Sequence, residues 1–268
     1  MRLNTAEIEK RAVSLRQEHN VQTYGVKDIF SLVEQEDIEL IRYPFGKDVL
    51  LGFATVYEGK KVIVSNSSEI LSREIFTIAH ELGHIVYDFE DFVSDVKIDT
   101  EISETSEDVA EARAYYFADC FLMPLAQLTE FIRLELKKHP EDLKALDIAR
   151  IQLEFNVSYS AAVKWLCDAG VISTTKRNAL YESKQQMHVN ALFKMLDADE
   201  LLIKPANVIK VPTQFLEYVT SNYENEYIPF SSLQKALELL GKDAAPFAKE
   251  EIRSQDDVDI NKIFEEYQ

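Results

Sequence analysis

The chain has 268 residues, of which 46% are hydrophobic and 28% are charged, so it can bury a core in one large domain or two smaller ones. Its net charge of −18 repels phosphate backbones and disfavours direct nucleic-acid binding. Two cysteines are too few for a disulfide framework, and neither a signal-peptide pattern nor an apolar stretch of transmembrane length is visible. We therefore expect a cytoplasmic protein with no membrane partner.

The N-terminal part is predicted to form two helices and then strands. Apolar residues at helical spacing predict a helix over residues 5–19 and a shorter one over 26–34. Three β-rich runs follow, over residues 38–43, 49–57 and 61–65. Gly59 lies in a hairpin turn between the last two runs. We expect a small antiparallel sheet ahead of the next helix.

A longer helix is predicted from about Ser72 to Phe89. It contains His80-Glu81-Leu82-Gly83-His84, the H-E-x-x-H motif that recurs in metalloproteases. The two histidines are one helical turn apart on one face, so both can bind a single tetrahedral zinc ion at about 2.0–2.1 Å. Glu81 lies beside the metal rather than on it, where it can accept a proton from water. The alternative to a metal site is two surface histidines on an amphipathic helix. The apolar residues on both sides of the motif disfavour it.

A catalytic zinc ion needs a third protein ligand, and a carboxylate on the following helix is the best candidate. Glu111 is followed by Ala114 and Ala118 on the same helix face. Because both alanines are small, this helix can pack closely against Gly83 and bring the Glu111 carboxylate to the two histidines.

The competitors for the third ligand lie in an acidic segment. Residues 88–108 contain nine acidic residues and a single lysine. Glu107, one turn before Glu111 on the same face, is the main competitor, and Asp108 is a weaker one. We favour Glu111.

Several of these runs together resemble the ImmA/IrrE family of zinc metallo-endopeptidases. The resemblance extends from about residue 10 to 240 and is carried by residues 62–66, Arg73, residues 76–84, 111–124, 155–158 and 169–173, and the later stretch 211–241. It implies that His80, His84 and Glu111 bind zinc and that Glu81 is the catalytic base. It also implies cleavage of a cytoplasmic regulatory protein, typically a helix-turn-helix repressor. One departure is Tyr115, where many members have an asparagine four residues after the ligand glutamate.

Peptide hydrolysis also needs a donor for the developing oxyanion and a surface for the substrate. Tyr115, Tyr116 and Tyr87 are all candidate donors on grounds of side-chain type, and the sequence does not choose among them. The sheet edge within residues 49–65 is expected to hold extended peptide as an added strand.

The remainder of the chain reads as helical. Residues 142–154 and 158–169 resemble a helix-turn-helix in outline. A plain packing unit is favoured over DNA reading, because Lys164 is the single basic residue of the second helix. We expect a zincin-like metallopeptidase domain over 1–138, a helix-turn-helix-like region over 139–185, and a helical extension with an acidic tail over 186–268.

The sequence therefore predicts an α+β fold, in which a small antiparallel sheet packs on two zinc-binding helices and an all-helical C-terminal half follows. The predicted function is a zinc-dependent endopeptidase of the cytoplasm, whose substrate is a basic helix-turn-helix repressor. Two alternatives stay open: a zinc-containing regulatory module that binds without cutting, and a zinc hydrolase acting on a non-peptide bond. The sequence sets no oligomeric state.

Overall fold

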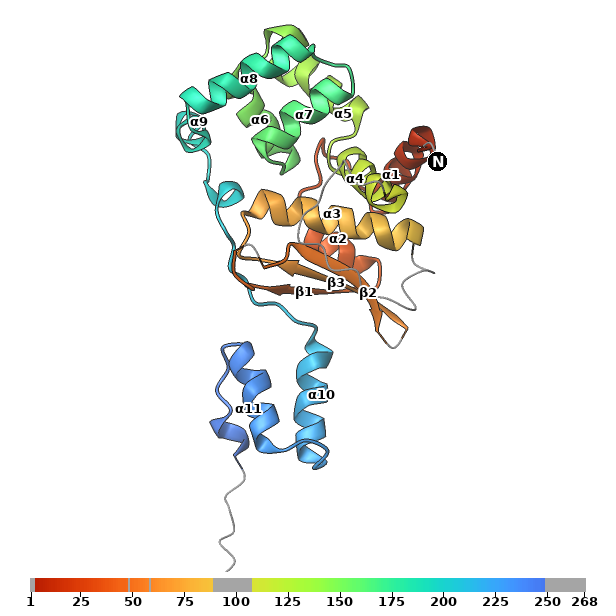
Figure 1. Ribbon diagram of the computed structural model, residues 1–268, viewed down its shortest axis with the longest axis vertical. Helices are drawn as coiled ribbons and strands as arrows, with labels where there is room; N and C mark the ends of the chain where they lie inside the picture. Colours follow the sequence, from red (N-terminus) through yellow and green to blue (C-terminus); the bar gives the residue numbers. More distant parts are fainter. Residues whose placement is uncertain (1–2, 48, 58, 89–107, 249–268) are drawn as a thin grey trace, which may run out of the picture. The chain divides into compact units, whose positions relative to one another are not determined.

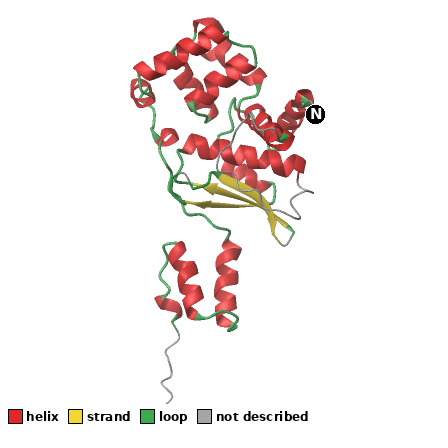
Figure 2. Cartoon of the chain, in the orientation of Figure 1, coloured by secondary structure: helices red, strands yellow, loops and turns green. Residues whose placement is uncertain are grey.

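The computed structural model describes residues 3–47, 49–57, 59–88 and 108–248 (Figure 1). The chain divides into two compact units, Met1–Pro212 and Thr213–Gln268. Figure 2 shows that the strands of the described residues all belong to the first unit. The domain boundaries expected from the sequence stay predictions.

One three-stranded sheet is found in the first unit, with the order β1-β3-β2. Its strands are β1 (Ile38–Tyr43), β2 (Gly52–Tyr57) and β3 (Lys60–Asn66). The central strand β3 pairs antiparallel with β2 and parallel with β1. The sheet is therefore mixed and not purely antiparallel as expected, because β3 inserts between the two strands that precede it instead of following β2 at the edge.

The β2 strand begins at Gly52 and not at Val49 as predicted. The Asn66 side chain explains the difference, since its Nδ2 donates to Gly46 O at 2.7 Å and to Leu50 O at 2.8 Å. These bonds hold the residues before β2 in a loop. The other edge of the sheet is covered at one position, because Arg42 and Lys210 exchange two backbone hydrogen bonds of 2.8 and 2.9 Å.

The motif helix α3 (Leu71–Asp88) packs on β2 and β3, and α2 (Ile29–Gln35) packs on β1 and α3. A buried ion pair joins α3 to the sheet. The Arg42 guanidinium donates two hydrogen bonds of 2.8 Å to the Glu74 carboxylate, and the Ser65 hydroxyl donates a third at 2.9 Å. Phe30 of α2 stacks on the same guanidinium at 3.8 Å. This network connects the sheet, α2 and the first turn of α3, which precedes the H-E-x-x-H motif.

The helix α4 (Val109–Leu122) packs along α3, and α1 (Thr5–Glu18) packs on α4. A Cβ atom added to Gly83 would lie 3.0 Å from Ala114 Cα and 3.2 Å from Ala114 O. The two helices therefore approach closely at Gly83, and the packing expected from the small residues of α4 is confirmed.

The rest of the first unit is helical. Its elements are α5 (Leu125–Phe131), a π-helical turn (Ile132–Leu136), a 3₁₀ turn (Pro140–Asp142), α6 (Ala145–Phe155), α7 (Tyr159–Asp168), α8 (Thr174–Gln186), α9 (Val189–Met195) and a 3₁₀ turn (Leu201–Ile203). Between α6 and α7, Asn156 adopts φ 56°, and the Ser158 hydroxyl caps α7 by accepting a hydrogen bond from Ala161 N. This is the helix-turn-helix outline expected from the sequence.

The second unit is described from residue 213 to 248. It contains α10 (Thr213–Glu224), α11 (Phe230–Leu239) and a 3₁₀ turn (Ala245–Phe247). Tyr223, Leu233 and Leu237 form its small core. The predicted acidic tail beyond residue 248 lies outside the described residues.

The α+β class with a helical C-terminal half is confirmed. Among the helices of the described residues, none combines the length and the apolar character that a bilayer crossing requires.

We expect Glu74→Gln to lower the free energy of unfolding by about 3–5 kcal/mol, because it leaves the Arg42 guanidinium buried without its carboxylate. The matched control is Glu39→Gln. Glu39 pairs with Lys60 at 2.7 Å near the surface, and its loss should cost less than about 1 kcal/mol. Urea unfolding followed by circular dichroism measures both. Equal losses in the two variants would contradict a central role for the Arg42–Glu74 pair.

Candidate metal centre

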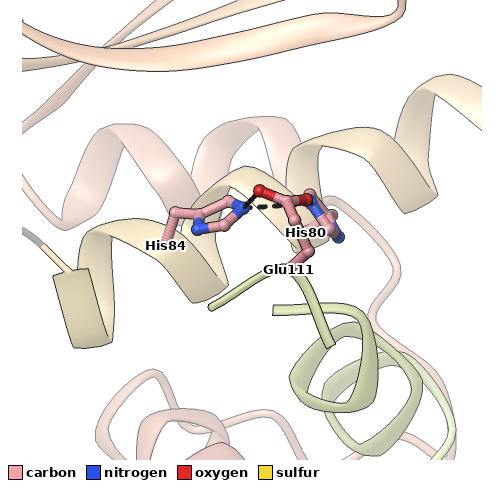
Figure 3. Close-up of side chains that lie close together, drawn as sticks. All are labelled: His80, His84 and Glu111. Atoms are coloured by element: carbon pink, nitrogen blue, oxygen red, sulfur yellow. Dashed lines mark hydrogen bonds and ion pairs between the residues drawn. The ribbon is translucent and has the colours of Figure 1, made fainter. Parts of the chain in front are cut away.

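Three side chains from α3 and α4 meet at one point (Figure 3). His80 Nε2 lies 3.1 Å from His84 Nε2 and 3.2 Å from Glu111 Oε2, and His84 Nε2 lies 3.3 Å from Glu111 Oε1. Both histidines thus present the same ring nitrogen to the shared point. Helical spacing on α3 aligns the imidazoles, and the close approach of α4 supplies the carboxylate from its first turn.

The charges around this point favour a cation. Burial lowers the pKa of His84, but its contacts with Asp88 and Glu111 and the charge of Glu81 outweigh burial and raise that pKa to about 10. The contacts with His80 and then His84 hold the pKa of Glu111 well below its usual range. A negative potential that favours a proton on a buried imidazole also favours a metal cation there.

The donor set fits a zinc ion. Two imidazoles and one carboxylate are the ligands of a known class of catalytic zinc site, which keeps a fourth position open. Tetrahedral ligands at about 2.0–2.1 Å from a metal are separated from one another by about 3.3 Å. The two imidazole nitrogens lie 3.1 Å apart, and each has one Glu111 oxygen close to it, Oε2 at 3.2 Å from His80 Nε2 and Oε1 at 3.3 Å from His84 Nε2, so these closest approaches are near this value.

Asp88 is a further residue of the site that sequence reasoning missed. Its carboxylate contacts His84 Nδ1 at 3.1 Å from the last turn of α3, and Arg113 of α4 forms an ion pair with it. A carboxylate on the far nitrogen fixes the orientation of a metal-binding imidazole. The four-residue spacing from His84 could have revealed it, but Asp88 was counted with the acidic segment.

The remaining predicted residues fall in different places. Glu81 is 2% exposed and lies on α3 between the two histidines. Asp108 caps α4, since its carboxylate accepts a hydrogen bond from Ala110 N. Glu107 lies outside the described residues, as does most of the acidic segment around it.

The three tyrosines differ in their contacts. Tyr116 donates its hydroxyl proton to Glu9 Oε1 of α1 at 2.6 Å. The Tyr115 ring packs on Phe76, with 5.0 Å between ring centroids. The Tyr87 ring packs edge-on against Phe117, and its buried hydroxyl has no hydrogen-bond partner among the described residues. The structure therefore directs the Tyr116 proton to α1, and the choice of oxyanion donor stays a prediction.

An H-E-x-x-H helix completed by a carboxylate from the next helix defines the mononuclear metal centre of a class of metallopeptidases. The family model described as the IrrE N-terminal-like domain, a peptidase family, matches residues 24–166. This match covers more than half of the chain and includes all three candidate ligands. The chain therefore belongs to the IrrE N-terminal-like metallopeptidase family. A comparison with curated proteins gave no significant match.

We expect Glu111→Gln to lower zinc affinity by more than about 100-fold, because a charged donor is lost. Asp88→Asn should lower it by about 10- to 100-fold, the usual cost of losing the partner of a ligand histidine. Competition with a zinc chelator of known affinity measures both values, and elemental analysis should give about one zinc ion per wild-type chain.

Glu107→Gln and the exposed Glu130→Gln are the controls and should keep wild-type affinity. Full affinity in Glu111→Gln together with a loss in Glu107→Gln would move the third ligand back by one helical turn. Undiminished zinc in a His80→Ala, His84→Ala double variant would contradict the site as a whole.

Proposed function

We propose that this chain is a zinc-dependent endopeptidase that acts in the cytoplasm and cleaves a regulatory protein, namely a basic helix-turn-helix repressor. The observation that carries the proposal is the meeting of His80, His84 and Glu111 donors at one point beside the buried Glu81. Membership of a metallopeptidase family supports the hydrolytic part.

The chain's own residues divide the chemistry between them. When bound, zinc supplies a Lewis acid that polarises the scissile carbonyl and lowers the pKa of water to about 7. The Glu81 carboxylate accepts the proton of the attacking water and then delivers it to the leaving amine. Its position next to His80 on a rigid helix keeps this carboxylate within reach of the same point. Asp88 holds the imidazole of His84 in orientation.

The sheet offers a place for extended peptide. The β2 strand lies at the edge of the order β1-β3-β2, and α3 packs against it. Within the described residues, β2 pairs with β3 alone, so its outer backbone groups can bind a peptide as an added strand. The opposite edge is covered at Arg42 by Lys210. These contacts support a substrate that runs along β2.

The charge of the chain supports a basic partner. A net charge of −18 attracts proteins with a basic DNA-binding face by long-range steering and repels nucleic acid itself. The low cysteine content supports a reducing compartment such as the cytoplasm.

We expect Glu81→Gln to lower kcat by about 100- to 10,000-fold while keeping wild-type zinc content, because it removes the base and none of the ligands. The substrate is a purified basic helix-turn-helix repressor encoded near this protein, incubated with and without chelator and analysed by mass spectrometry. Zinc bound without any cleavage by the wild type would favour the regulatory-module alternative. Cleavage of small non-peptide esters or amides alone would favour the other hydrolase alternative.

The Glu81→Gln variant should also capture its substrate, since binding survives when cleavage is lost. We expect the association rate with the repressor to fall at least about tenfold between 0.1 and 1 M salt, because the screening length shortens from about 10 to about 3 Å. Stopped-flow measurements over a salt series test this. A rate indifferent to salt, or capture of acidic proteins only, would count against a basic partner.

A further inference from the structure

A cavity of about 540 Å³ lies apart from the three candidate metal ligands. Helices α1, α4, α5 and α7 of the first unit contribute to its walls, and these helices can be followed in Figure 1. The lining combines three aromatic side chains with three carboxylates, namely Tyr115, Tyr116, Trp165, Glu9, Asp119 and Asp168. Its volume falls within the range of about 300–1,000 Å³ that is usual for small-ligand sites.

Asp119 is the unusual member of this lining. It is 4% exposed, and no hydrogen bond to its side chain is found within the described residues. Burial raises the pKa of the Asp119 carboxyl, and the charge of Asp168 adds to the rise. A buried carboxylate without a hydrogen-bond donor lowers the stability of the folded state.

Two other buried carboxylates of the described residues, Glu74 and Asp147, accept hydrogen bonds from charged side chains. Glu74 accepts hydrogen bonds from Arg42 and Ser65. Asp147 accepts hydrogen bonds from Lys138 Nζ at 2.6 Å and from the Lys144 backbone at 2.8 Å. Asp119 differs from both because its side chain borders a cavity and, among the described residues, has no hydrogen-bond donor beside it.

One cation of the protein itself, the Lys164 ammonium, already lies in the lining. The Lys164 ammonium, which also lines the cavity, pairs with Asp168 at 2.7 Å and lies 5.1 Å from the centroid of the Tyr115 ring. Aromatic faces and carboxylates together favour alkyl-ammonium and guanidinium groups. The lining holds three carboxyl groups and this one ammonium, so its composition is acidic and suits a second cation beside Asp119.

We propose that this cavity binds an alkyl-guanidinium or alkyl-ammonium group, with Asp119 as its carboxylate partner and the rings of Tyr116 and Trp165 as walls. The site goes beyond the proposed peptidase activity and does not require it. The cation can come from two sources, an arginine or lysine side chain of a bound protein or a free small amine.

The cavity shares lining residues with a second one that touches the metal-binding helix. Tyr115 and Lys164 also line a second cavity of about 290 Å³, which reaches Phe76 of α3. Phe76 lies one helical turn before His80. The two cavities thus share Tyr115 and Lys164, and the lining of the second one extends to the metal-binding helix.

The test uses Trp165, which is the single tryptophan of the chain and lines the cavity. Its indole N–H is already bonded to Met123 O at 2.9 Å, so changes in its emission report on the cavity. Zinc-loaded protein is titrated with N-acetyl-arginine amide, with agmatine and with N-acetyl-citrulline amide, which has nearly the shape of the first probe without its charge. We expect saturable binding of the two cations and at least about tenfold weaker binding of the citrulline compound.

Asp119→Asn should weaken binding of both cations at least about tenfold, while the exposed Asp142→Asn should bind as the wild type does. Because the raised pKa makes the ionised Asp119 unfavourable in the folded state at neutral pH, the asparagine variant should unfold at an equal or higher urea concentration. That measurement shows that the variant is folded.

Tighter binding of N-acetyl-arginine amide than of agmatine would identify a protein side chain as the source, and the reverse order would identify a free amine. The proposal is overturned if neither cation binds at millimolar concentration, or if the citrulline compound binds as well as the arginine compound. Wild-type binding by folded Asp119→Asn would overturn it too. All three outcomes are read without peptidase activity, so they are independent of the proposed function.

Discussion

The close contact between α3 and α4 at Gly83 is the constraint on which the metal centre depends. A Cβ at that position would meet Ala114 Cα at 3.0 Å, so the two helix backbones lie as near as glycine and alanine allow. Glu111 lies on α4 about one turn before this contact, and its oxygens come within 3.2 and 3.3 Å of the two imidazoles. Metal–ligand distances tolerate only about 0.2 Å of error, so larger residues in the contact would separate the donors of the site.

The opposite side of α3 is fixed by the sheet. The Arg42–Glu74 pair holds the first turn of the helix, and Gly52 of β2 lets the next turn approach, since a Cβ there would lie 2.6 Å from the Thr77 methyl carbon. Thr77 precedes His80 by three residues. The motif helix is thus held between a strand and a second helix just where its functional side chains begin. Such support on both faces limits the motion of a catalytic constellation.

Local patterns in the sequence predicted the parts of this arrangement that depend on local geometry. Helical spacing gave the common face of His80 and His84, and small residues after Glu111 predicted the approach of α4. The parallel pairing of β1 was missed, because short alternating strands carry no information on which neighbour inserts between them. The surroundings of Asp119 could not be predicted either, because Trp165 of α7 lines its cavity and contacts between segments far apart in the chain leave no periodic signal.

The covered edge of the sheet has a consequence for self-association. Lys210 exchanges backbone hydrogen bonds with Arg42 of β1, so this edge is blocked at one position. A sheet with two open edges can add copies of itself without limit, which leads to fibres. The chain segment that follows the helical region therefore blocks the β1 edge at Arg42 and leaves fewer unpaired backbone groups there for edge-to-edge pairing.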